Sequence, residues 1–121
     1  MSVLLDSVIL IDHLNGHSAA TGYLRTLESA SISVITRAEV LAGLEPRALD
    51  PVRRLLDRYP ALPIDAETAD LAADLRRANK WKLPDAFQAA LAQRHGLKLA
   101  TRNIRDFPPE KHSFVVAPYR I

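Results

Sequence analysis

The sequence predicts an α/β domain built around a mainly parallel sheet. Five short apolar segments have the length of buried strands, and segments with helical spacing of apolar residues separate most of them. No two-residue hairpin turn joins two of these strands, so successive strands are expected to run parallel. The length of 121 residues, with 48% hydrophobic and 25% charged residues, fits one globular domain spanning residues 1–121.

The first part of the chain is expected to form one strand and two helices. Val3 to Asp6 is a short, mostly apolar run with the length of a buried strand. Ser7 follows as a helix cap, and Asn15-Gly16 ends that helix because these residues favour helix termini. A second helix is expected from Ser18 to about Ser29, with its apolar side chains facing inward.

The middle of the chain is expected to supply two strands and two helices. Residues 32–35 form the next strand, and a helix runs from Thr36 until Pro46 stops it. Residues 49–58 form an amphipathic helix with apolar and arginine side chains on opposite sides. Residues 62–64 contain a proline, which cannot donate to a sheet ladder, so this strand belongs at an edge or end of the sheet.

The last part of the chain contains the clearest helix, which runs from an Asp65 cap to Asn79. A further helix is expected to begin near Pro84 and to end at Gly96. Proline is suited to the first turn of a helix, because the backbone N–H that it lacks would have no partner within the helix. Residues 98–101 and 114–116 are the remaining strands.

Composition excludes several classes of protein. The absence of cysteine excludes disulfides, thiolate metal sites and cysteine nucleophiles. No apolar run approaches the roughly 20 residues that span a bilayer, and the Met1-Ser2-Val3 start lacks a signal peptide, so a cytoplasmic location is expected. The net charge of +2 and the pI near 9.2 are compatible with an anionic partner without establishing one.

Four acidic residues stand at the ends of apolar elements, far apart in sequence: Asp6, Glu39, Asp85 and Asp106. Ligands of an open α/β sheet sit outside the carboxyl ends of its strands, so acids delivered there would meet in one cleft. Crowded carboxylates repel one another, and a hard divalent cation relieves that repulsion. The pattern therefore favours a metal-dependent phosphodiesterase.

Four motifs in order resemble those of the PIN domain family, and the short chain is most similar to its VapC-type toxin ribonucleases. The resemblance covers about residues 3–116, and the motifs are residues 5–12, 35–43, 83–92 and 99–107. It implies a three-layer α/β/α sandwich with a sheet of four to five strands. It also implies an endoribonuclease that uses Mg²⁺ or Mn²⁺.

The resemblance also assigns residues. Asp6, Glu39 and Asp85 match the metal ligands of the family. The fourth position departs from the pattern, because many members have aspartate where this chain has Asn103, whereas others use the acid before the phenylalanine, here Asp106. Asp106 is preferred as the fourth catalytic and metal-binding acid, because the neutral amide of Asn103 offers one weak oxygen and no charge.

Elementary chemistry predicts supporting roles around these acids. Ser7, Thr101 and Asn103 are expected to hydrogen-bond carboxylates or water around the metal. Asp85, at a helix N-terminus, is expected to stay ionised in the field of the helix dipole.

Cations close to the acids are candidates for binding RNA. Seven residues are assigned this role: Arg76, Arg77, Lys80, Trp81, Lys82, Arg102 and Arg105. The cations would hold phosphates, and the tryptophan would stack an unpaired base. The alternative with equal weight is a helix C-terminus with complementary basic charge and a core tryptophan.

The resemblance implies partners as well. A VapB-type antitoxin would occupy the acidic cleft, where an arginine could pair with two carboxylates and displace the metal. The segments from Val40 to Leu44 and from Val52 to Leu56 could offer a groove to an antitoxin helix, unless their leucines all belong to the core. A homodimer is expected, with a heterotetramer or larger assembly when the antitoxin is bound.

Other functions compete with this one. A receiver-type signalling domain also gathers acids above a parallel sheet, and a catalytically degenerate PIN-like module would bind RNA or protein without cleavage. Each acid could instead cap a helix or turn. Asp12 is expected to face solvent or a basic neighbour, and His13 and His17 form a weak zinc candidate because Gly16 interrupts their helix.

Overall fold

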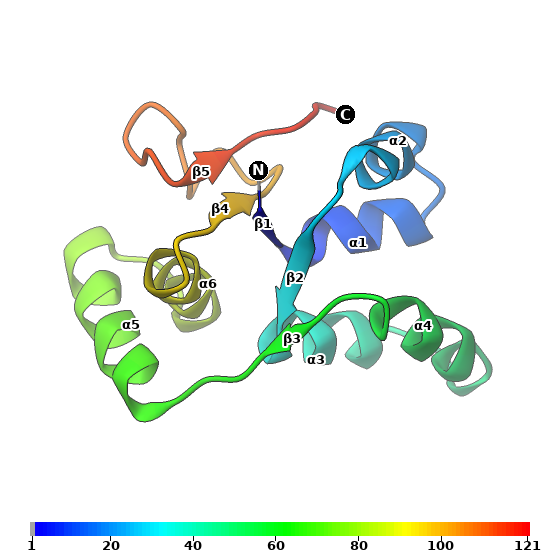
Figure 1. The fold of residues 1–121 in the computed structure, drawn as a ribbon, viewed down its shortest axis with the longest axis horizontal. Coiled ribbons are helices and arrows are strands. Elements are labelled where there is room, and N and C mark those ends of the chain that lie inside the picture. Colours follow the sequence, from blue (N-terminus) through cyan, green and yellow to red (C-terminus); the bar gives the residue numbers. More distant parts are fainter. Residues whose placement is uncertain (1) are drawn as a thin grey trace.

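The computed structural model describes residues 2–121 and contains a five-stranded sheet (Figure 1). Met1, part of the segment inspected for a signal peptide, lies outside the described residues. Every strand pairs in parallel with its neighbours, in the order β3-β2-β1-β4-β5. The strands are β1 (Val3–Leu5), β2 (Ala30–Ser33), β3 (Ala61–Leu62), β4 (Lys98–Ala100) and β5 (Val115–Val116).

Helices cover both faces of the sheet, which confirms the three-layer α/β/α sandwich. In Figure 1, α5 and α6 lie on one side of the sheet and the other four α-helices lie on the opposite side. The helices are α1 (Ser7–Leu14), α2 (Ser18–Thr26), α3 (Val34–Ala42), α4 (Leu49–Leu56), α5 (Ala66–Asn79) and α6 (Leu83–Arg94), with a short 3₁₀ helix η1 (Pro46–Ala48) before α4.

The alternation of side chains along β1 builds two separate cores. Val3 and Leu5 point to one face and pack with the helices α1, α3 and α4, whereas Leu4 points to the other face and packs with α6. All three side chains are buried, so the central strand is apolar on both faces. This is the pattern of a parallel sheet that is covered by helices on both sides.

The second strand ends earlier than its sequence predicts. The sequence predicts a strand for residues 34 and 35, but they form the first turn of α3. The Ser33 hydroxyl oxygen accepts a hydrogen bond from the Thr36 N–H at 2.9 Å, which caps the helix at this point. Val34 and Ile35 are β-branched and therefore favour a strand, but the cap at Ser33 starts the helix before them.

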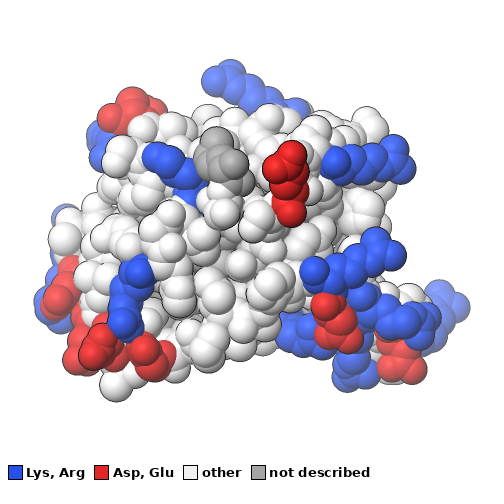
Figure 2. Space-filling model, in the orientation of Figure 1, with Lys and Arg blue, Asp and Glu red and all other residues white. Residues whose placement is uncertain are grey.

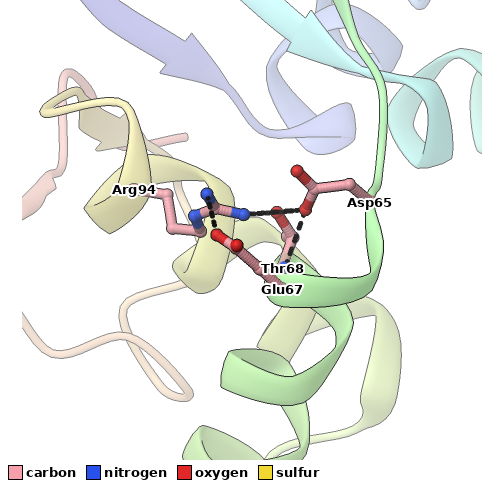
Figure 3. Close-up of polar contacts among 4 residues, drawn as sticks. All are labelled: Asp65, Glu67, Thr68 and Arg94. Carbon is pink, nitrogen blue, oxygen red and sulfur yellow. Dashed lines mark hydrogen bonds and ion pairs between the residues drawn. The ribbon is translucent and has the colours of Figure 1, made fainter.

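The helix pair α5 and α6 packs closely through small side chains and a polar clamp. Four of the buried side chains of α6 are alanines, which let the helix approach its neighbours. Arg94 at the end of α6 donates to Asp65 and Glu67, each at 2.7 Å (Figure 3). Asp65 also accepts from the Thr68 N–H at 2.8 Å, so the predicted cap of α5 also joins α5 to α6.

The order of the strands creates a crevice at one place on the sheet. The chain runs outward from β1 through β2 to β3 and then returns to the other side of β1 to form β4 and β5. The point at which the order reverses, between β1 and β4, is where open α/β sheets bind ligands. A receiver domain has a different order, 2-1-3-4-5, so the topology excludes that alternative.

Charged side chains gather at two ends of the face drawn in Figure 2, one formed by α4 and the other by α5. Many are paired, as in Arg37–Asp57 at 2.9 Å and Arg53–Asp50 at 3.2 Å, and such exposed pairs add little stability. No helix among the described residues has both the length and the apolar character that a membrane-spanning helix requires.

Candidate functional site

Three of the predicted acids meet at the crevice between β1 and β4. Asp6 follows β1, Glu39 lies on α3 and Asp85 lies in the first turn of α6. Their side chains border one open hollow of about 440 Å³. The complete lining is Asp6, Ser7, Val8, Glu39, Asp85, Arg102, Asn103, Ile104 and Arg105.

Asp6 is the most firmly held of the three acids. Its Oδ1 atom caps α1 by accepting from the Ser7 N–H at 2.9 Å, and its Oδ2 atom accepts from the buried Thr101 hydroxyl at 2.6 Å. The Asp6 backbone N–H donates to the Ala100 carbonyl at 2.9 Å, which joins the ends of β1 and β4. Thr101 therefore makes the carboxylate contact expected of it, and the orientation of Asp6 is set from the sheet below.

Gln88 completes this support, although its sequence context did not single it out. Its Nε2 atom donates to Asp6 Oδ1 at 3.3 Å and to Thr36 Oγ1 at 2.7 Å. Gln88 is only 1% exposed, and its Oε1 is a buried oxygen without a hydrogen-bond partner in residues 2–121. Its position three residues after Asp85, on the same face of α6, is the signal that could have revealed it.

The Asp85 carboxyl group, in the first turn of α6, has a raised pKa. Burial raises the pKa from 3.8 to about 6, and the charges of Asp6, Asp106 and Glu39 add to this effect. Lys82 opposes the rise. Desolvation and repulsion from three carboxylates therefore make ionisation of Asp85 less favourable than in water, although a pKa of about 6 leaves the group ionised at pH 7.

Glu39 is an exposed residue on α3. Its carboxyl group nevertheless borders the hollow, where desolvation raises its pKa. A hydrogen bond with Ser7 lowers the pKa and the charge of Asp6 raises it. Ser7 thus acts on Glu39 through its side chain and on Asp6 through its backbone.

The two candidates for the fourth position, Asn103 and Asp106, contact each other beside the hollow. The preference for Asp106 as the fourth acid stays a prediction. Asn103 lines the hollow, whereas Asp106 borders a neighbouring hollow. The Asn103 Nδ2 atom donates to Asp106 Oδ2 at 3.0 Å. The Asn103 amide is therefore held against Asp106, whose charge raises the pKa of Asp85.

Replacing Asp106 with asparagine is expected to lower the pKa of Asp85 from about 6 toward 3.8, because one of the three repelling charges is removed. The pKa should stay above 3.8, since burial is the largest cause of the shift. Carboxyl-carbon NMR titration of Asp85 measures this change. Asp106→Glu keeps the charge and is the matched control, so an equal fall in both variants would contradict the electrostatic explanation.

Trp81 is a core residue, so its assignment to base stacking is wrong. The side chain is 6% exposed, and its ring centroid lies 4.9 Å from that of Phe107 and 5.1 Å from that of His112. The indole N–H donates to the Asp106 carbonyl at 2.7 Å. The structure thus shows the core alternative, in which Trp81 anchors the loop that carries Asn103.

The predicted RNA-binding cations occupy different surroundings. Arg105 lines the acidic hollow and also the neighbouring hollow that contains Lys80, Lys111 and His112. Arg102 also lines the acidic hollow, but its charge is already paired with the buried Asp12. Asp12 thus faces a basic neighbour, one of the two surroundings expected for it, and not solvent. Another hollow is bordered by Arg76, Arg77 and again Lys80, and Lys82 is exposed near Asp85.

The donor set at the hollow fits a hard divalent cation. Among residues 2–121, no three or more histidine, aspartate or glutamate side chains already close around one point. Mg²⁺ does not require such closure, because one or two carboxylates, waters and a substrate phosphate usually complete its shell. The oxygen-only donors and the repulsion that raises the pKa of Asp85 are the conditions a cation relieves.

The alternative zinc site finds no support. His13 Nδ1 lies 2.7 Å from Thr21 Oγ1, and His17 caps the start of α2 without a side-chain hydrogen bond to it.

The structure has carboxylates at the point where the strand order of a parallel α/β sheet reverses. This arrangement is the one expected for the family that the four sequence motifs resemble. The PIN domain family matches this sequence over residues 3–108, and the chain belongs to that family. Ribonuclease VapC10 of Mycobacterium tuberculosis is 34% identical over 114 residues, which cover 88% of this chain and 86% of that protein.

Solved structures extend the comparison. A chain in a toxin-antitoxin complex from Klebsiella pneumoniae is 36% identical, with a TM-score of 0.91 and coverage of 98% of this chain and 99% of that chain. FitAcB from Neisseria gonorrhoeae is 25% identical, with a TM-score of 0.78 and coverage of 98% of each chain. The whole fold, rather than one motif, is therefore shared with these proteins.

Proposed function

We propose that this chain is a Mg²⁺- or Mn²⁺-dependent endoribonuclease and the toxin of a toxin-antitoxin pair. The observation that carries the proposal is the convergence of Asp6, Glu39 and Asp85 on one hollow at the switch point of a PIN domain. The names of the relatives support the activity, since one is a ribonuclease and another belongs to a toxin-antitoxin complex.

Some residues at the hollow would bind the cation, and others keep the cation-binding side chains in their orientation. Asp6, Glu39 and Asp85 would hold the cation, and the Asn103 amide borders the same space. When bound, a divalent ion would lower the pKa of a water molecule and stabilise negative charge on the leaving oxygen. Thr101 and Gln88 keep Asp6 oriented toward that position through hydrogen bonds of 2.6 and 3.3 Å.

A basic path beside the acids supports an RNA substrate. Arg105 borders the acidic hollow and the next one, where Lys80 and Lys111 add positive charge. None of these three makes an ion pair within residues 2–121, which leaves their charges available to phosphates. Phosphate contacts of this kind position a strand without selecting its bases.

An antitoxin would control the enzyme by covering the acidic hollow with an arginine, because a planar guanidinium can pair with two carboxylates. The groove first expected for its helix is not available in that form, since Val40, Val52 and Leu56 are buried in the core. Exposed apolar side chains on α1 and α3, Ile11, Leu14 and Val34, are better candidates for its docking surface.

The same proposal includes the location and assembly of the protein. A chain without cysteine suits the reducing cytoplasm, where its RNA substrates would be found. Two copies would form a homodimer that brings two hollows to one RNA, and antitoxin chains would enlarge it to a heterotetramer or beyond.

The decisive test is to incubate the purified chain with a mixed RNA pool in Mg²⁺ or Mn²⁺, with EDTA and with Asp85→Asn protein as controls. We expect cleavage that requires both the metal and Asp85. RNA binding without cleavage would support the degenerate module instead.

The toxin assignment has its own test, which uses the neighbouring gene. Expression of the chain alone should arrest growth, and co-expression of the neighbour should yield a copurifying protein that suppresses cleavage. A harmless chain with no binding neighbour would refute the toxin role even if the chain cleaves RNA.

A further inference from the structure

Asp12 and Arg102 form a second charged group next to the acidic hollow. The Asp12 side chain is 4% exposed, and it accepts from Arg102 Nε at 2.7 Å and from Arg102 Nη2 at 2.9 Å. The Tyr119 hydroxyl donates to the same carboxylate at 2.7 Å. Asp12 therefore receives three hydrogen bonds, from the loop after β4 and from the C-terminal tail.

This group joins three parts of the chain at the hollow. Asp12 lies on α1, and Arg102 lies directly between Thr101, which orients Asp6, and Asn103, which lines the hollow. The tail that carries Tyr119 runs from β5 toward α2 in Figure 1, where Tyr119 packs against Tyr23 at a centroid distance of 6.4 Å. The tail is thus joined to α1 through the Tyr119 hydroxyl and Asp12.

Arg102 borders the same hollow as Asp6, Glu39 and Asp85, and this position creates a conflict. Guanidinium groups form bidentate pairs with carboxylates, and the acids of the hollow repel one another. An unrestrained Arg102 would therefore be drawn to them and would occupy the place of a cation. Asp12 instead engages the Nε and Nη2 edge of the guanidinium, which fixes the plane of the group.

We propose that Asp12 is a positioning residue that, together with Tyr119, holds Arg102 at the rim of the hollow and thereby keeps the three acids available to a divalent cation. The inference depends on the proposed function, because it assumes that the hollow binds a cation. It assigns a role to an acid that is not itself at the hollow. Asp12 keeps an internal cation from competing with the metal.

The experiment measures Mn²⁺ binding by calorimetry and by the EPR signal of free Mn²⁺, without RNA. Asp12→Asn keeps the shape of the side chain and removes its charge, and we expect it to weaken Mn²⁺ binding by about 10-fold or more, the range seen when outer contacts of a metal site are lost. Arg102→Met alone should bind Mn²⁺ at least as tightly as the wild type. The double variant Asp12→Asn/Arg102→Met should regain that affinity, because the competing cation is gone.

Rescue by the second substitution separates positioning from a general structural role, since damage to the loop after β4 would not be repaired by removing Arg102. Tyr119→Phe deletes only the hydroxyl and gives a second variant if Asp12→Asn does not fold, as judged by circular dichroism. It should weaken Mn²⁺ binding by a smaller factor. Wild-type affinity in both Asp12→Asn and Tyr119→Phe, or a double variant no better than Asp12→Asn, would overturn the inference. A wild type that binds no Mn²⁺ would refute the proposed metal site itself.

Discussion

Asp85→Asn is expected to reduce RNA cleavage by at least about 100-fold and, in the absence of metal, to make the protein more stable. The variant loses a carboxylate that would hold the cation. It also loses a charge that burial and three neighbouring acids disfavour, as the raised pKa of about 6 shows. Single-turnover cleavage and urea denaturation without metal measure the two effects.

The stability effect has a defined dependence on pH. Because the folded-state pKa of Asp85 lies above its ordinary value of 3.8, the unfolded state releases this proton first, and the wild type loses stability as pH rises from about 3.8 to about 6. The advantage of the variant should therefore be fully present above this pH and disappear near pH 4. Mg²⁺ should reverse the order by stabilising the wild type more, since binding to the folded state alone adds stability by mass action.

Asp70→Asn is the matched control, because Asp70 is an exposed acid on α5 that makes no ion pair within residues 2–121. It should leave cleavage and the response to Mg²⁺ unchanged. Equal loss of cleavage in both variants, or a metal-free Asp85→Asn protein that is less stable than the wild type at pH 7, would contradict the electrostatic account of the hollow.

Trp81→Ala is expected to lower the free energy of unfolding by about 3–5 kcal/mol, the usual cost of deleting a large buried aromatic side chain. The substitution leaves a cavity against Phe107 and removes the hydrogen bond to the Asp106 carbonyl, so the loop with Asn103 loses its anchor. Urea denaturation followed by far-UV circular dichroism measures the change without relying on tryptophan fluorescence.

Trp81→Phe separates packing from the hydrogen bond. It retains most of the buried ring and should lose only about 1 kcal/mol, the contribution of a typical hydrogen bond. A stable Trp81→Ala protein with weakened RNA binding would instead revive the role in base stacking and refute the core position.

The sequence by itself determined the architecture and the three acids at its centre. Parallel strands follow from apolar segments separated by amphipathic helices, and the Asp65 cap marks the start of α5 because capping is a contact between near neighbours in the chain. The sequence alone predicts that Asp6, Glu39 and Asp85 lie close together, because the carboxyl ends of parallel strands open on one edge of the sheet. These inferences depend on local periodicity and on one general rule of topology.

Only the tertiary structure decided what surrounds those acids. Three features depend on how a loop of irregular backbone folds against distant elements: the contact of Asn103 with Asp106, the burial of Trp81 and the pairing of Arg102 with Asp12. Gln88 supports Asp6 across 82 positions of sequence, a contact that no local pattern contains. The pKa of Asp85 is decided in the same way, because desolvation and the charges of three acids add up only after folding has placed them around one hollow.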